Sequence, residues 1–585
     1  MPSDTAERNL LWASLMVEEL SRCGVRHCCI SPGSRSSPLA LAVARHPRIE
    51  SMVHFDERAA AFYAVGLARA TGETAAWITT SGTAAANGWP AVVEAANACL
   101  PLLLLTADRP PELRATGANQ TIDQVKMFGD SVRWHLDMPC PGTDVPLEYA
   151  LTSIDQAVYR TRSTPAGPVH LNCMFREPLV PLTPPAAAAF PDSLGAWRDS
   201  HRPFTLYAEA SPVANRQAVT ELIRALSQCR RGLLVVGQLA TADREPVRKL
   251  AMALGWPLVA DITSGLRLGG QALPLAAYAD QLLLSEPLAA RLQPDAVLHV
   301  GGPVTSKRVA QYLAHHRPPL YVRLQDHPFR HDPLHHVTWT LQADLAALCD
   351  PLAAGVTPVT DEAWLRAWLA AQPELDARIE SFLGGQDGLS EMAVAREVSR
   401  QLPATHGLFL ASSMPIRDMD MYAVETGTPC AVSANRGASG IDGTLASAAG
   451  FARGLGLPVT VLIGDLACLH DLNSLDIVRR SLQPMTLVVI NNNGGGIFSF
   501  LPVAGHKDVF ERVFATPHGL HFEGVASMFG LAYARPHTPA EFAATYRRAI
   551  AGSESSIIEV VTDRQDNVRL HTELQARIRD VLDGR

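Results

Sequence analysis

The chain carries the stretch VTVLIGDL at residues 459–466 and the stretch LVVINNNGG at residues 487–495. In each stretch, an apolar run typical of a buried parallel strand ends in polar or glycine-rich residues. Asp465 follows the first run, and Asn492 follows the second run 27 residues later. Ligands bind at the carboxyl ends of parallel strands, so we expect both side chains at one edge of a sheet. The pair predicts a doubly wound α/β domain with a binding site at that edge.

The two side chains offer the oxygen ligands that Mg²⁺ takes, commonly together with phosphate groups. Gly494 and Gly495 let the backbone approach an anion and present its N–H groups to it. Each motif alone has a plainer interpretation, a helix cap for Gly464-Asp465 and a turn for the asparagine-glycine run. Their combination on consecutive predicted strands favours a divalent cation bound with a phosphate-bearing group.

Similar apolar runs recur along all 585 residues, too many for one hydrophobic core. A Pro/Ala-rich stretch at 181–189 and a soft region at 353–361 separate three groups of predicted strands. We therefore predict three doubly wound parallel-sheet domains, at residues 1–185, 200–355 and 375–585. The predicted strands are 27–30, 75–80 and 102–107; then 232–237, 257–261, 296–302 and 320–324; then 407–413, 430–435, 459–465, 486–493 and 556–561.

Composition excludes several kinds of partner. The net charge of −8 argues against a nucleic-acid partner, which needs excess Lys and Arg. No apolar run reaches the roughly 18 residues of a membrane span, and the start is an acidic amphipathic helix unlike a signal peptide. The ten cysteines show no metal-binding spacing, which suits a reducing, cytoplasmic location. The glycine motifs of nicotinamide-binding and P-loop domains do not occur.

The Gly-Asp and Asn-Asn pair resembles the signature of thiamine-diphosphate-dependent enzymes. The resemblance implies Mg²⁺ (or Mn²⁺) held by Asp465, Asn492 and the carbonyl of Gly494. Leu466 stands where that signature has glycine, a departure that concerns local backbone geometry more than the side-chain ligands. Thiamine diphosphate itself would contact Glu57, Ser81, Gly82, Ile441, Gly464, Leu466, Asn491 and Ile497.

Glu57 lies in the segment HFDERAA at 54–60, ahead of a small-residue helix at 62–70. A glutamate at a helix start is explained equally well by the helix dipole. In the thiamine superfamily such a glutamate hydrogen-bonds N1′ of the aminopyrimidine, so the resemblance implies an acid–base role for Glu57. We expect a carboxylate in that role to be shielded from water.

Four longer segments resemble the family of 2-succinyl-5-enolpyruvyl-6-hydroxy-3-cyclohexene-1-carboxylate synthases of menaquinone biosynthesis. They are SPGSRS at 31–36, LTADRPPELRATGANQ at 105–120, NRGASGIDG at 435–443 and NNNGGGIFS at 491–499. The family reaction joins 2-oxoglutarate, after loss of CO₂, to isochorismate by 1,4-addition. The resemblance also implies a homodimer or dimer of dimers with active sites at the subunit interface.

Both substrates of that reaction carry carboxylates, which the planar fork of Arg suits. By resemblance, Ser413 and Arg417 hold the succinyl carboxylate, and Gln120 lies near the reacting carbons. Ile441 would hold the two rings of the cofactor in their bent form, while Ile497 and Phe498 would line the pocket of the thiazolium and the succinyl group. By resemblance, the acceptor's carboxylates would face Ser34, Arg35, Arg109, Lys307 and Arg308. We expect these cations, together with Arg417 and Arg436, at strand ends or turns.

Two alternatives remain open. One is another thiamine enzyme, such as an acetolactate synthase or a 2-oxo acid decarboxylase, although the turn at 301–303 leads to Lys307-Arg308, which suits a carboxylate better than a flavin. The other is a non-catalytic scaffold, which would be free to lose Glu57, Asp465 or Asn492. Release of CO₂ from a 2-oxo acid distinguishes an enzyme from a scaffold.

Overall fold

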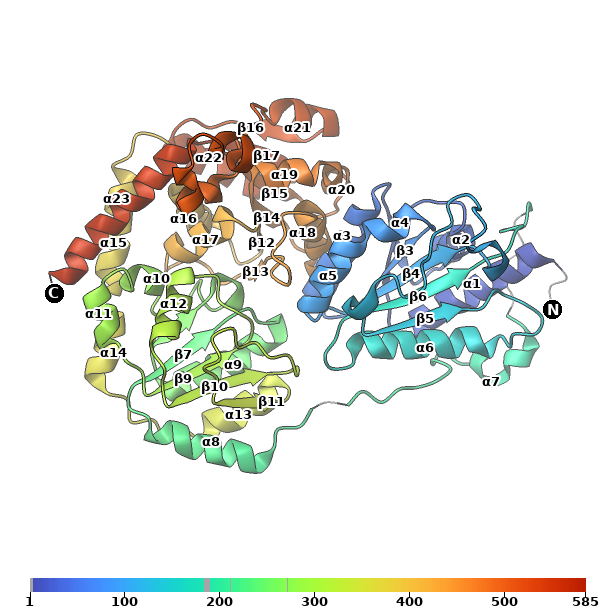
Figure 1. Ribbon diagram of the computed structural model, residues 1–585, viewed down its shortest axis with the longest axis horizontal. Coiled ribbons are helices and arrows are strands. Elements are labelled where there is room, and N and C mark those ends of the chain that lie inside the picture. Colours follow the sequence, from blue (N-terminus) through green and yellow to red (C-terminus); the bar gives the residue numbers. More distant parts are fainter. Residues whose placement is uncertain (1–3, 184–189, 211, 271, 585) are drawn as a thin grey trace. The chain divides into compact units, whose positions relative to one another are not determined.

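The computed structural model describes residues 4–183, 190–210, 212–270 and 272–584 (Figure 1). Three parallel sheets, each flanked by helices, form three α/β domains, as predicted. The chain packs as two compact units. The first comprises Met1–Ala210, Asn435–Gly456 and His470–Leu482, and the second comprises Ser211–Ala434, Leu457–Leu469 and Gln483–Arg585.

The sheet of the first unit has the strand order β2-β1-β3-β4-β6-β5, and every pairing is parallel. Its strands are β1 (His27–Ile30), β2 (Glu50–Val53), β3 (Ala75–Thr79), β4 (Leu102–Asp108), β5 (Trp134–Met138) and β6 (Pro168–Met174). Its helices include α1 (Thr5–Arg22), α2 (Ser37–Arg45), α3 (Glu57–Thr71), α4 (Thr83–Asn87), α5 (Trp89–Asn97), α6 (Glu148–Arg162) and α7 (Gly195–Arg198).

Three strands of this sheet escaped prediction. β2 lies at the sheet edge and is mostly exposed, so it lacks an apolar run. β5 is only half-buried, at the other edge. β6 is fully buried, but His170 and Asn172 interrupt its apolar pattern. Edge position and buried polar side chains are the two reasons why periodicity failed here.

The first unit also contains α18 (Thr444–Leu455) and α20 (Leu475–Arg479). Helix α18 packs against α3 through small residues. A Cβ at Gly66 would lie 2.0 Å from the carbonyl oxygen of Ser447, and one at Gly450 would lie 2.1 Å from that of Tyr63. Backbone contact this close explains why the helix predicted at 62–70 is rich in small residues.

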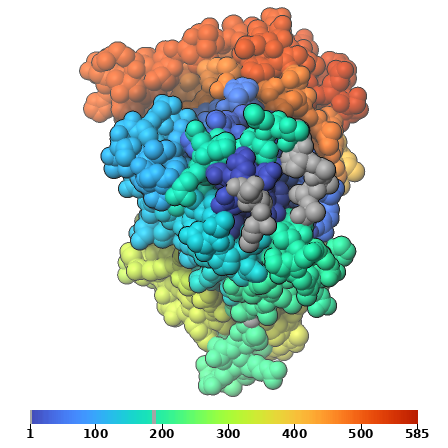
Figure 2. All heavy atoms as spheres, turned by 90° about the vertical axis from the view of Figure 1, so that its right-hand side faces the viewer, coloured from blue at the N-terminus to red at the C-terminus, as the bar shows by residue number. Residues whose placement is uncertain are grey.

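The segment that follows β6 returns to α1. The Trp197 indole donates to Glu19 over 2.6 Å, and Arg22 lies 3.9 Å from the centre of the Trp197 ring. In the space-filling view of Figure 2, green atoms of the segment after β6 lie beside dark blue atoms of the N-terminal helix. Burial raises the pKa of Glu19, and Asp155 acts in the same direction. Part of the predicted linker, residues 184–189, lies outside the described residues, as does the predicted boundary at 185.

The second unit contains a sheet of order β11-β10-β9-β7-β8, again wholly parallel. Its strands are β7 (Gly232–Val236), β8 (Leu258–Ala260), β9 (Ala296–Val300), β10 (Leu320–Gln325) and β11 (Trp339–Gln342). Its helices are α8 (Arg216–Gln228), α9 (Arg244–Leu254), α10 (Ala279–Leu282), α11 (Glu286–Arg291), α12 (Lys307–His315), α13 (Leu345–Gly355), α14 (Glu362–Leu369) and α15 (Gln372–Gly384).

The last sheet, also in the second unit, has the order β13-β12-β14-β15-β17-β16. Its strands are β12 (Gly407–Leu410), β13 (Ala431–Ser433), β14 (Val459–Gly464), β15 (Met485–Asn491), β16 (Ala532–Ala534) and β17 (Ser556–Val561). Its helices are α16 (Glu391–Gln401), α17 (Met414–Tyr422), α19 (Asp465–His470), α21 (Glu523–Phe529), α22 (Pro539–Ala551) and α23 (Arg564–Asp583). Strands β14 and β15 are direct neighbours, with Gly464 opposite Ile490. This pairing places their carboxyl ends side by side. Among the described residues, no helix is long and apolar enough to cross a membrane.

Candidate active site

Asp465 and Gly494 meet at the carboxyl ends of β14 and β15. The Gly494 N–H donates to Oδ2 of Asp465 over 2.9 Å, and the N–H of Leu466 donates to Oδ1 over 2.6 Å. Asp465 is buried, so its charge is held away from bulk water. His518 lies 3.1 Å from the same Oδ2 and was not predicted, because no sequence spacing connects it to Asp465. The arrangement leaves a buried carboxylate beside a glycine turn, which suits a divalent cation.

Asn492 supports the same conclusion through an unsatisfied atom. Its side chain is buried, and its Oδ1 finds no hydrogen-bond partner among the described residues. Buried amide oxygens are normally paired, because an unpaired one costs about 1–3 kcal/mol. Magnesium or manganese accepts such an oxygen as a ligand. The predicted ligand set of Asp465, Asn492 and the Gly494 carbonyl therefore fits a hard cation.

Glu391 is a functional candidate that the sequence did not reveal. It begins α16, is buried, and accepts a hydrogen bond of 2.9 Å from Nδ2 of Asn492. Burial raises the pKa of Glu391, and the charges of Asp418 and Asp465 act in the same direction. No motif links a residue at 391 to one at 492, so only the tertiary structure connects them.

The neighbouring Asn491 faces the opposite way from Asn492, as alternation along a strand requires. Its Nδ2 donates to Glu559 over 2.6 Å and to the Leu520 carbonyl over 2.9 Å. The side chain of Asn491, predicted to bind the cofactor, is thus bound within the protein. Asn493 adopts a φ of 58°, and its Oδ1 accepts hydrogen bonds from the backbone N–H groups of His518 and Gly519, which ties the loop at 518–519 to the turn.

Ser413 and Arg417 lie together at the start of α17. Ser413 has a φ of 77°, unusual for a residue with a side chain, and the Arg417 guanidinium donates to its carbonyl oxygen. The hydroxyl of buried Ser412 has no partner among the described residues. Strand β12 is shorter than predicted because the chain turns into this helix. Arg417 therefore lies within a helix rather than at the predicted strand end.

Ile497 and Phe498 are half-buried in the short helical turn at 496–500. A Cβ on Gly495 would come within 2.7 Å of the Phe498 ring, so this glycine is needed for the ring to pack against the turn. Phe514 lies 5.9 Å from Phe498, centre to centre. The two predicted wall residues thus follow directly on the proposed metal turn.

Lys307 and Arg308 depart from their predicted environment. Both lie in the first turn of α12, not at a strand end. Lys307 is exposed. Arg308 forms an ion pair with Asp280 and also donates to its carbonyl oxygen over 3.0 Å. The prediction assumed that Lys307 and Arg308 end a turn. In the structure Ser306 caps helix α12, and the two cations are the first residues of that helix.

In the first unit, Glu57 is the first residue of α3, and Asp56 caps that helix. The Asn87 amide donates to Glu57 Oε2 over 3.1 Å. A cavity of about 380 Å³ is lined by Phe55, Asp56, Glu57, Arg58, Asn87 and Asn473. Within this unit Glu57 is only half-buried, less shielded than we expected.

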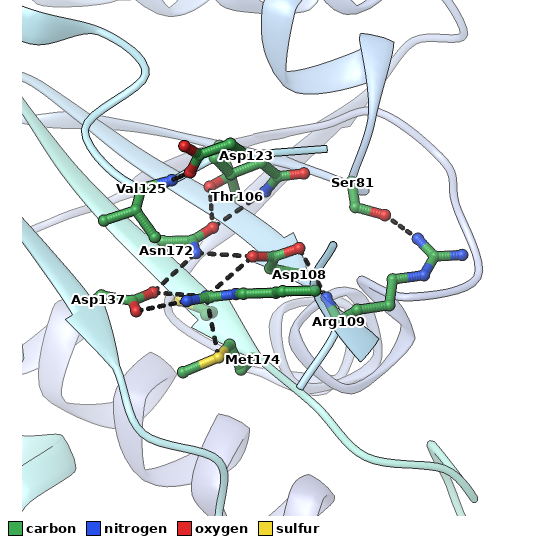
Figure 3. Close-up of polar contacts among 12 residues, drawn as sticks. Ser81, Thr106, Asp108, Arg109, Asp123, Val125, Asp137, Asn172 and Met174 are labelled. Carbon is green, nitrogen blue, oxygen red and sulfur yellow. Dashed lines mark hydrogen bonds and ion pairs between the residues drawn. The ribbon is translucent and has the colours of Figure 1, made fainter. Parts of the chain in front are cut away.

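The turn after β3 brings together several predicted residues (Figure 3). Arg109 donates to the Ser81 hydroxyl, which lies 3.1 Å from the Gln120 carbonyl. The Gln120 amide donates to the Ser81 carbonyl over 2.8 Å. Gln120 itself is exposed and has a φ of 57°. Burial and the neighbouring Arg35 lower the pKa of Arg109. Arg35 itself is buried and bonded to Glu177 over 2.7 Å, whereas Ser34 is exposed.

A polar network beneath this turn was not predicted (Figure 3). Arg114 binds both oxygens of Asp137 over 2.9 Å and Asp108 over 3.0 Å. Asn172 donates to the same two carboxylates. Burial alone would raise the pKa of Asp137, yet hydrogen bonds from Arg114 and Asn172 outweigh it and lower that pKa. Gln124 completes the network, accepting from the N–H of Gly82 and donating to Asn172.

The segment 435–443 carries Arg436 and Ile441, both half-buried. Glu94 of α5 accepts hydrogen bonds from the N–H groups of Gly437 and Ala438, over 2.9 and 2.7 Å. A Cβ at Gly437 would lie 2.4 Å from the Glu94 carbonyl oxygen. Glu94 therefore holds this segment through its backbone, which explains the glycine.

Comparison with known proteins gave three family matches. Residues 12–127 match the thiamine pyrophosphate enzyme N-terminal TPP binding domain. Residues 189–410 match the middle domain of thiamine pyrophosphate enzymes. Residues 420–560 match the thiamine pyrophosphate enzyme C-terminal TPP binding domain.

Full-length relatives carry the name 2-succinyl-5-enolpyruvyl-6-hydroxy-3-cyclohexene-1-carboxylate synthase. The relative from Rubrobacter xylanophilus is 53% identical over 98% of this chain and 99% of its own length. The relative from Salinibacter ruber is 46% identical over 98% and 97%, and that from Prosthecochloris aestuarii is 44% identical over 99% and 98%.

Proposed function

Because the chain belongs to the 2-succinyl-5-enolpyruvyl-6-hydroxy-3-cyclohexene-1-carboxylate synthase family of thiamine pyrophosphate enzymes, we propose that it removes CO₂ from 2-oxoglutarate and adds the remaining succinyl unit to isochorismate. The product would serve menaquinone or phylloquinone biosynthesis. The observation that carries the proposal is the 53% identity over nearly the whole chain, joined to a metal-ready turn at Asp465 and Asn492.

Thiamine diphosphate, when bound with Mg²⁺, supplies the thiazolium that takes up the electrons released as CO₂ leaves. Asp465, Asn492 and the Gly494 carbonyl would hold the metal, and Gly464, Leu466, Asn491 and Ile497 would contact the cofactor from the second unit. Ser81, Gly82 and Ile441 are the proposed contacts from the first unit. Glu57 would hold the proton shared with N1′ of the aminopyrimidine.

The substrate carboxylates would be bound by cations of the chain. Ser413 and Arg417 are proposed for the distal carboxylate of 2-oxoglutarate, since both lie at the start of one helix. Arg35 and Arg109 are proposed for isochorismate, since two buried guanidinium groups close enough to lower a pKa favour an anion between them. Gln120 would orient the bound acceptor. Ser34, Lys307, Arg308, Arg436 and Phe498 complete the proposed substrate contacts.

We propose a homodimer or dimer of dimers with active sites at the subunit interface, in the cytoplasm. Family membership supports the assembly, and the ten free thiols support a reducing compartment. Light scattering on the purified protein tests the assembly, and a monomer that turns over at full rate would refute it.

The test of the activity is CO₂ release from 2-oxoglutarate with thiamine diphosphate and Mg²⁺, with and without isochorismate. Rapid release that needs isochorismate, together with loss of isochorismate absorbance, is expected. Release from pyruvate instead would point to an acetolactate synthase or decarboxylase, and no release from any 2-oxo acid would point to a scaffold.

A further inference from the structure

The carboxylate of Glu391 contacts the side chain of Asn492 inside the second unit. Glu391 is 3% exposed and opens α16 directly after its cap, Ser390. Nδ2 of Asn492 lies 2.9 Å from Oε1 of Glu391, and the Thr562 hydroxyl donates to the same oxygen over 3.3 Å. Glu391 thus gathers donors from the residues that follow β15 and β17.

A carboxamide can present either its oxygen or its NH₂ group in a given direction, and only the oxygen binds a cation. The structure pairs the acceptor oxygen Oε1 of Glu391 with the NH₂ end of Asn492, which donates to it. The other end, Oδ1, is then turned away from Glu391 and is left without a partner among the described residues. Gly496 confines the group further, because a Cβ there would lie 2.5 Å from Nδ2.

We propose that Glu391 is a positioning residue that holds the Asn492 carboxamide with Oδ1 directed to the divalent cation. The inference rests on the proposed function, since it requires the cation and thiamine diphosphate to bind. Groups that orient metal ligands typically contribute about 10–100-fold to metal affinity. Glu391 acts through Asn492 and touches neither substrate nor reacting atoms.

The test measures Mg²⁺ affinity by calorimetry at saturating thiamine diphosphate, without any turnover. Glu391→Met removes the acceptor but keeps the side-chain volume, and we expect it to raise the Mg²⁺ Kd by about 10–100-fold. Glu391→Gln keeps an acceptor oxygen and should rescue affinity to near the wild-type value. If the Met variant does not fold, Glu391→Asp withdraws the acceptor by one methylene and should weaken Mg²⁺ in the same direction.

A double-mutant cycle separates positioning from a general structural effect. In an Asn492→Ala background, Glu391→Met should cost no further Mg²⁺ affinity. An equal loss in both backgrounds, or a Met variant that binds Mg²⁺ like the wild type, overturns the inference while the proposed function stands. A wild-type protein that binds thiamine diphosphate without any divalent cation would overturn the proposed metal site, and this inference with it.

Discussion

The backbone N–H of Gly494 donates to the carboxylate of Asp465 across the ends of two neighbouring strands, over 2.9 Å. The contact fixes the turn after β15 against the start of α19. It requires a backbone that only glycine adopts readily, since Gly494 has a φ of 133° and a Cβ there would lie 2.0 Å from the Ala515 carbonyl oxygen.

Gly494→Ala should therefore destabilise the second unit by about 1–3 kcal/mol, the usual cost of a strained backbone, and should weaken Mg²⁺ binding. Thermal unfolding and Mg²⁺ titration measure the two effects. Gly505→Ala is the matched control, because a Cβ there would meet open space. Equal behaviour of the two variants would contradict the strain argument.

Asp465→Ala should lower the affinity for Mg²⁺ and for thiamine diphosphate together, since the cation links the diphosphate to the protein. The loss in Mg²⁺ affinity should exceed about 100-fold, because even groups that merely orient a ligand contribute up to that much. Calorimetric titration with each component measures it. Asp508→Ala, at an exposed position of the same unit, should change neither Kd. An unchanged cofactor Kd in Asp465→Ala refutes the metal site.

Glu57→Gln should lower turnover by about 10²–10⁴-fold, the range of general acid–base catalysis, while leaving the cofactor Kd nearly unchanged. The amide keeps the shape of the side chain but does not exchange the proton. Single-turnover CO₂ release and cofactor titration separate the two effects. Glu73→Gln, exposed on the same unit, serves as the control. Full activity in Glu57→Gln would rule out the acid–base assignment.

Arg417→Ala should reduce kcat/KM for 2-oxoglutarate by roughly 30-fold, since a charged hydrogen bond contributes about 2 kcal/mol. A 2-oxo acid without the distal carboxylate should be affected much less. Arg417→Lys should recover only part of the loss, because an ammonium lacks the planar fork. Equal losses for both oxo acids would show that a residue other than Arg417 binds the distal carboxylate.

His170 makes the first unit sensitive to acid. Burial lowers the pKa of His170 from 6.5 to about 3, and its ring contacts the Thr106 hydroxyl over 2.7 Å. Between those values the unfolded chain binds a proton that the folded chain excludes, so stability falls as pH drops below 6.5. At pH 5 the loss amounts to about 2 kcal/mol, at 1.4 kcal/mol per pH unit.

His170→Gln should remove this loss, so its stability should change about 2 kcal/mol less between pH 7 and pH 5 than that of the wild type. Urea unfolding followed by tryptophan fluorescence at the two pH values measures the difference. His315→Gln, at an exposed position, should keep the wild-type pH dependence. Identical pH dependence in His170→Gln would show that His170 titrates normally in the folded protein.

The apolar runs were sufficient to predict most strands of the three sheets, because a strand buried on both faces needs a continuous apolar stretch. The same runs were sufficient to predict that Asp465 lies close to the asparagine-glycine turn, because neighbouring parallel strands end at the same edge of a sheet. The edge strands β2, β5, β11 and β16, and β6 with its polar interior, broke that pattern and were found only in the structure.

Sequence motifs determined the family and the residue types at the candidate site, because the residues of such a site are grouped in short contiguous segments of the chain. The supporting contacts were decided by tertiary structure alone. The contacts of Glu391 with Asn492, Glu94 with Gly437 and Arg114 with Asp137 join residues 23 to 343 positions apart. Such contacts leave no periodic or spaced signal, because their partners are chosen by packing in three dimensions. The ion pair of Arg308 with Asp280 is a further example. The motif identifies the cation, but only the structure shows that a carboxylate of the same chain binds it.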